Sequence, residues 1–312
     1  MPLALACASH TPLMRDGYCP DDIRVAVSDG FRSLSDAIRD FSPDLVIQFS
    51  PDHFNGFFYD VMPSFCIGMA AESVGDWHTR SGPLDVPEAE AARLASALVE
   101  GGFDIATSYR MKVDHGFVQL WENLGATAFD LPTIPIFVNC AAPPLPTFRR
   151  ARELGEAVGR FAVSLDRKVL LVASGGLSHD PPTPRITTAP PEVRERLIAN
   201  RNPTPEARAA HQQRVLAAGR DALAGTGGIL PVSEAWDADF LRCLREEPPA
   251  VFDTWSVRDL PAVAGRGAPE VLCWVAAVAA LSAAGAIRTE LHFYRAIQGW
   301  LAGMAMLSGR AG

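Results

Sequence analysis

The sequence predicts an α/β protein with a single three-layer domain over residues 1–312, a mostly parallel or mixed central sheet covered by helices, and a helical C-terminal part. Three observations support this prediction. Short, continuous apolar runs, typical of strands buried on both faces, alternate with helical patterns. A chain of 312 residues is long enough to bury a large core. Hydrophobic residues make up 48% of the chain and charged residues 21%, which excludes a disordered protein.

Four apolar runs are predicted to be strands, and a turn or polar residue follows each one. They cover residues 3–7, 44–49, 134–138 and 169–172. Helices are predicted between and after these strands, because apolar residues recur at intervals of three and four, as on one helix face. The helical patterns cover residues 27–41, 91–98, 149–165 and 205–223.

The segment 180–205 is rich in Pro, Thr and Arg, and we expect it to form a surface loop or the margin of a lid. After about residue 206 the pattern is largely helical. The longest apolar run, residues 271–284, is too short to span a bilayer and is predicted to be a buried helix.

Charge and cysteine content limit the possible partners and compartment. The net charge of −8 argues against a nucleic-acid-binding protein. The six cysteines include no CxxC pair, and several lie in apolar runs, where we expect them to be buried. No basic segment precedes the first apolar stretch, so a secretory signal is not expected. These features predict a cytoplasmic protein without membrane contact, and we expect a homo-oligomer.

Three histidines follow predicted strands. His10, His53 and His179 each occupy this position, and in open α/β sheets the carboxyl ends of the strands form the ligand crevice. We therefore expect them to converge, although each alone could be a structural residue that forms hydrogen bonds. His115 lies beside Asp114 and before a glycine. His211, by contrast, is expected on a polar helix surface.

One carboxylate stands at the start of the late apolar helix. Glu270 follows Pro269, and an acid in this first turn can simply stabilise the helix dipole. A buried helix that begins with Glu can also direct a carboxylate into the interior, where it needs a cation or hydrogen-bond donors. Two histidines and one carboxylate form the ligand set of non-haem Fe(II) oxygenases, and zinc accepts the same ligands.

Four segments of the chain resemble class III extradiol ring-cleavage dioxygenases of the LigB type. They are Ser9–Pro12, Ser50–Pro63, Val113–Phe117 and Ser174–His179. The resemblance covers nearly the whole chain and implies one LigB-like domain. Within Ser50–Pro63, the part from Asn55 to Pro63 is more similar to the members that act on catechols with a three-carbon carboxylate side chain.

The resemblance implies roles for six residues. His10, His53 and Glu270 would bind Fe(II), although Glu270 matches less closely than the histidines. His115 and His179 would be the acid–base pair, with His115 favoured as the base and His179 as the acid. Asp114 would orient His115 or shape the pocket.

The implied reaction is the extradiol opening of a catechol ring by dioxygen in the breakdown of aromatic compounds. Four alternatives remain at this point: another catechol, an aminophenol, hydrolysis with zinc, or a LigB-like protein without catalysis. The presence of both His115 and His179 argues against the last, because a binding protein needs no proton donor and acceptor beside its metal.

Overall fold

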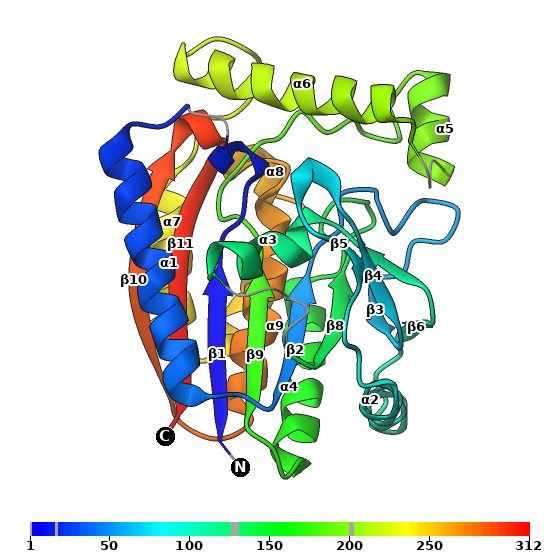
Figure 1. Ribbon diagram of the computed structural model, residues 1–312, viewed down its shortest axis with the longest axis vertical. Coiled ribbons are helices and arrows are strands. Elements are labelled where there is room, and N and C mark those ends of the chain that lie inside the picture. The colour runs from blue at the N-terminus through cyan, green and yellow to red at the C-terminus, as the bar shows by residue number, and fades with distance from the viewer. Residues whose placement is uncertain (1, 16–17, 126–130, 200–202) are drawn as a thin grey trace.

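The architecture is a large mixed sheet with helices on both faces (Figure 1), in a computed structural model that describes residues 2–15, 18–125, 131–199 and 203–312. Eight strands form the sheet in the order β10-β11-β1-β9-β2-β8-β3-β6. Their bounds are Ile287–Ile297 (β10), Ala302–Ala311 (β11), Leu3–Ala8 (β1), Val169–Ser174 (β9), Leu45–Ser50 (β2), Thr133–Val138 (β8), Phe65–Gly68 (β3) and Ala106–Ser108 (β6). A three-stranded sheet contains Ala71–Val74 (β4), Ser81–Pro83 (β5) and Met111–Val113 (β7).

The centre of the large sheet is parallel. Strands β1, β9, β2 and β8 run in the same direction, and every residue of these four strands is buried. These are the four strands that the apolar runs predicted. Because parallel strands end at one edge of a sheet, the residues after β1, β2 and β9 come together there.

Helices cover both faces of this sheet. The face covered by Asp21–Phe41 (α1) and His115–Asn123 (α3) has one hydrophobic core, and the opposite face has a second. On that second face, Val271–Ser282 (α9) lies against β9, β1 and β2, and Phe148–Ser164 (α4) packs on α9. The remaining helices of the second core are Glu88–Glu100 (α2), Glu234–Glu246 (α7) and Leu260–Val263 (α8).

Helix α9 explains the long apolar run near the end of the chain. Its residues from Val271 to Leu281 are all buried, because the sheet lies on one side and α4 on another. A helix enclosed in this way is apolar all round. No helix in the described residues is long and apolar enough to cross a membrane.

The segment 180–205, expected to be a surface loop or the margin of a lid, includes a helix in its described part. It contains the helix Pro191–Ala199 (α5), and Pro205–Leu223 (α6) follows with the predicted bounds. Figure 1 shows α6 lying across the end of the molecule at which β1 and β9 end. This helix contacts the short 3-10 helices Pro12–Arg15 (η1) and Gln298–Trp300 (η5).

The C-terminal part is helical only up to α9. The expectation of a helical end is wrong for residues 287–311, which form the antiparallel pair β10 and β11 at the edge of the large sheet. In β10, intermediate and exposed residues alternate from Ile287 to Glu290, the period-two pattern of an edge strand. Three other 3-10 helices are Asp76–His78 (η2), Pro249–Thr254 (η3) and Ala268–Glu270 (η4).

Candidate metal centre and active site

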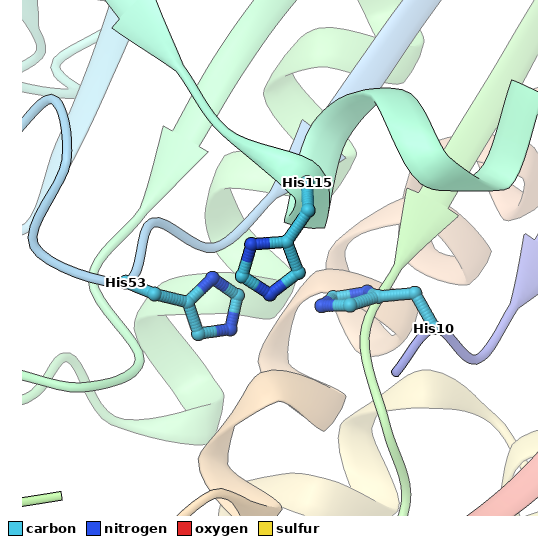
Figure 2. A group of neighbouring side chains, drawn as sticks. All are labelled: His10, His53 and His115. Carbon is cyan, nitrogen blue, oxygen red and sulfur yellow. The ribbon is translucent and has the colours of Figure 1, made fainter. Parts of the chain in front are cut away.

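Three histidine rings meet at the carboxyl edge of the sheet. Figure 2 shows His10, His53 and His115 facing a common point. The ring centres lie 5.4 Å apart for His10 and His53, 5.5 Å for His10 and His115, and 4.3 Å for His53 and His115. One nitrogen from each ring lies within 4.8 Å of the others, a spacing that could hold a metal ion.

Glu270 joins this group from the other side of the sheet. It ends η4, immediately before α9, and it is buried. Its Oε1 lies 3.1 Å from His53 Nε2 and 3.3 Å from His179 Nε2, and its Oε2 lies 3.9 Å from His10 Nε2. The structure therefore brings His10, His53, His179 and Glu270 together. The convergence of the three strand-end histidines is confirmed.

The outward nitrogen of each histidine has a partner. His10 Nδ1 lies 3.0 Å from Ser174 Oγ, and His53 Nδ1 lies 3.1 Å from Asp114 Oδ2. His115 Nδ1 lies 2.6 Å from Asp76 Oδ2. Metal-binding histidines typically hold their second nitrogen in this way, which fixes the orientation of the ring.

The ionisation of His10 and of Glu270 is compatible with metal binding. Burial lowers the pKa of His10 to about 3, against the opposing effect of Glu270, and a neutral imidazole is the form that binds metals. Burial alone would raise the pKa of Glu270, but His179 and His53 hold it well below its usual range. A buried carboxylate among inward imidazole nitrogens therefore fits a divalent cation.

Asp114 differs from the expectation that it would orient His115. Its carboxylate caps α3 by accepting from Gly116 N at 2.9 Å, and it also accepts from His53 N at 2.8 Å and Asn55 Nδ2 at 2.9 Å. The side chain thus holds the backbone and the ring of His53. The His115 ring pairs instead with Asp76, because η2 lies against the start of α3.

The ring of His179 lies against the backbone at Gly267, just before Glu270. Its Nδ1 lies 2.9 Å from the Leu177 carbonyl oxygen and donates to it, and its Nε2 lies 3.3 Å from Glu270 Oε1. A Cβ at Gly267 would lie 2.0 Å from His179 Nε2. Only glycine leaves room for the ring at this point.

A cavity of about 540 Å³ opens from these side chains. Its inner end contains the four histidines and Glu270, and its outer wall comes from the segment after His179 and from α5 and α6. A volume of this size is typical of sites for small organic ligands.

Two residues of this cavity were not identified from the sequence. Asp76 lies 39 residues before His115, in a turn whose sequence carries no periodic signal. His211 was expected on a polar helix surface, and it lines the cavity. The run of polar residues around it was the available signal, because polar residues line a wet cavity as readily as an outer surface.

The comparisons with known proteins agree with this geometry. The family model described as "Catalytic LigB subunit of aromatic ring-opening dioxygenase" matches residues 4–305. A protein of Photorhabdus laumondii, named 2,3-dihydroxyphenylpropionate/2,3-dihydroxicinnamic acid 1,2-dioxygenase, is 48% identical over 99% of this chain and 98% of its own. A protein of Rhodococcus sp with the same name is 47% identical over 100% of this chain and 99% of its own.

A solved structure shows the same fold at greater sequence distance. It is an uncharacterized protein from Escherichia coli K12, with a TM-score of 0.51 and 14% identity over 99% of each chain. The match of the family model over almost the whole sequence and the two relatives settle the classification. This chain belongs to the family of the catalytic LigB subunit of aromatic ring-opening dioxygenases.

Proposed function

We propose that this protein opens the ring of 3-(2,3-dihydroxyphenyl)propionate, and of 2,3-dihydroxycinnamate, by extradiol cleavage with dioxygen at a non-haem Fe(II) centre. The product of the first substrate would be 2-hydroxy-6-oxonona-2,4-dienedioate. The observation that carries the proposal is the convergence of His10, His53 and Glu270 beside two further histidines. The names of the relatives supply the substrate.

His10, His53 and Glu270 would hold the metal. With these two histidines and one carboxylate as its ligands, Fe(II) would supply open positions for a catechol and dioxygen. His115 is also near enough to be a ligand. We assign the third position to Glu270, because a buried carboxylate without a cation is unfavourable.

His115 acts as the base in this proposal. Asp76 pairs with its Nδ1, so the free Nε2 can take the proton of the second catechol hydroxyl. The carboxylate then stabilises the imidazolium that forms, as in other carboxylate–histidine pairs. Removing this proton matters because a chelating dianion binds a metal far better than a neutral diol.

His179 acts as the acid. Burial alone would lower the pKa of its ring, but Glu270 beside Nε2 and the Leu177 carbonyl beside Nδ1 raise it above the usual value, which favours the protonated form that an acid needs. The ring can therefore give up a proton from Nε2 to the substrate oxygen that becomes negative during ring opening. Histidine is a common general acid or base, because the pKa of a free imidazole lies near neutral pH.

One experiment tests metal and substrate together. Protein purified without oxygen is analysed for metals, and its oxygen uptake is then measured with a series of catechols. We expect iron, loss of activity in air and its recovery with ferrous iron and ascorbate. Full activity of zinc-loaded, iron-free protein would contradict the choice of metal. A higher kcat/KM for protocatechuate or an aminophenol would contradict the choice of substrate.

A further inference from the structure

The acidic and the basic side chains that line the cavity lie at different ends of it. The carboxylates that line it, Asp76 and Glu270, lie at the inner end and are hydrogen-bonded to histidines. The outer wall contains Arg196 on α5 and Arg208 and Arg214 on α6. None of these three arginines pairs with a carboxylate in the part of the chain that the structure describes.

The arrangement of α6 directs its cations toward the cavity. Arg208, His211 and Gln212 line it together, at the spacing of three and four residues that places side chains on one helix face. Arg208 is half-buried, whereas Arg214 and Arg196 are exposed. A half-buried guanidinium has lost part of its hydration and gains more from an anionic ligand than an exposed one does.

His211 on α6 lines the same cavity as these arginines and the histidines of the candidate active site. Burial in the cavity wall lowers the pKa of His211 to about 4, and the positive charge of Arg214 acts in the same direction. The ring therefore stays neutral at pH 7 and can offer a hydrogen bond. A ligand beside it is bounded by imidazoles on one side and by guanidinium groups on the other.

We propose that Arg208, supported by Arg214, binds the carboxylate of the substrate side chain while the catechol ring lies among the histidines. The assignment rests on the proposed function and specifies how the site selects its substrate. A guanidinium can hold a carboxylate through two parallel hydrogen bonds, which fixes orientation as well as affinity. In a protein of net charge −8, an anionic side chain needs such a local cation to enter.

The test compares an acid with a neutral analogue. We would measure kcat/KM for 3-(2,3-dihydroxyphenyl)propionate and for its methyl ester with Arg208→Gln, Arg214→Gln and the double variant. We expect Arg208→Gln to lower kcat/KM for the acid about 10- to 100-fold, mainly by raising KM, because it removes a hydrogen bond between charged groups. The ester should change less than about 2-fold, since it lacks the anion.

Two further variants serve as controls. Arg220→Gln removes the same charge from α6, at a residue that contacts Tyr18 and does not line the cavity, so it should leave both substrates unaffected. Arg208→Lys keeps the charge without the planar fork and should recover part of the loss. Iron content shows whether each variant retains its folded site.

The outcomes separate this inference from the proposed function. If the wild-type protein cleaves neither compound, the proposed function and the inference both fall. If it cleaves the acid, but the double variant keeps the same preference for acid over ester, only the inference is overturned. Equal losses on both substrates would likewise overturn it, because they would show a structural role for the arginines.

Discussion

At the scale of single residues, the histidines were easier to find than the side chains that orient them. His10, His53 and His179 follow buried strands, so the topology of the sheet alone predicts that they meet. Asp76 is brought to His115 by a turn 39 residues away, and no local pattern encodes that contact. The resemblance implied that Asp114 would orient His115 or shape the pocket, yet the Asp114 carboxylate accepts from His53.

Asp76 is predicted to be a positioning residue for His115. Its two oxygens lie 2.8 Å from the backbone nitrogen and 2.6 Å from the ring Nδ1 of His115. The Asn side chain in Asp76→Asn is uncharged and has only one acceptor oxygen, so it cannot accept hydrogen bonds from both the backbone N–H and the ring of His115. We therefore expect kcat to fall about 100- to 10,000-fold while iron content and KM change little. His115→Gln should behave in the same way, and so should His179→Gln.

A double variant separates positioning from a purely structural role. If Asp76 acts through His115, Asp76→Asn combined with His115→Gln should be no worse than His115→Gln alone, because groups that act as a unit are not additive. Additive losses would contradict this relation. Loss of iron from His115→Gln to the extent seen with a ligand variant would instead make His115 a ligand.

At the scale of elements, long buried segments were predictable and short ones were not. The four central strands and α6 come close to their predicted bounds, because continuous apolar runs and long helical patterns carry strong signals. Strands β5, β6 and β7 have three residues each, too few to show a period. The β10–β11 pair was missed because its alternating pattern follows a long helical stretch.

Helix α4 packs closely on α9 at Gly155, so a larger residue there should destabilise the protein. A Cβ at Gly155 would lie 2.0 Å from the carbonyl oxygen of Ala276 in α9. Alanine favours a helix over glycine by about 1 kcal/mol, but this backbone contact cannot relax without separating the two helices. Gly155→Ala should therefore lower the free energy of unfolding by about 1–3 kcal/mol in urea titrations. Gly228→Ala, at a site with open space, is the matched control, and equal stability of both variants would refute the argument.

Asp237, near the start of α7, should make the free energy of unfolding depend on pH. Asp237 is buried, and its carboxylate accepts from Ser178 N at 2.7 Å and from Tyr294 Oη at 2.9 Å. Burial raises its pKa to about 6 against the effect of these hydrogen bonds. The folded state thus binds the proton more tightly than the unfolded chain, whose Asp pKa is about 3.9. The stability that Asp237 contributes is present below about pH 4 and is lost as the pH rises through 6.

Asp237→Asn isolates this contribution. The Asn amide has one acceptor oxygen where the carboxylate has two, which should lower the free energy of unfolding by about 1–3 kcal/mol at every pH. The amide itself does not titrate. The stability deficit of the variant relative to the wild type should therefore shrink by about 2–3 kcal/mol between pH 4 and pH 7. Urea unfolding across this range measures the deficit. A constant difference for Asp237→Asn across this range would argue against the shift.

At the scale of the whole molecule, the candidate metal site joins segments from both ends of the chain. His10 follows the first strand, His53 follows β2, and Glu270 lies immediately before α9. Because these three ligands are remote in sequence, an unfolded chain would not hold them together. Metal binding should then stabilise the fold by mass action, by about 2.7 kcal/mol at a free metal concentration 100 times the Kd.

Glu270→Gln tests this coupling with two measurements on one variant. The change keeps the size of the side chain and removes its anion, so iron affinity should fall at least about 10- to 100-fold, and the rise in Tm with added Fe(II) should disappear at concentrations that stabilise the wild type. His78→Asn is the control, because His78 is exposed at a backbone φ of 61° that Asn tolerates. It should keep both the iron and the shift in Tm.

If Glu270 only stabilises the helix dipole, Glu270→Gln will lower the free energy of unfolding by about 0.3–1 kcal/mol and leave the iron bound. Full iron occupancy with a slightly lower Tm would therefore remove Glu270 from the metal site.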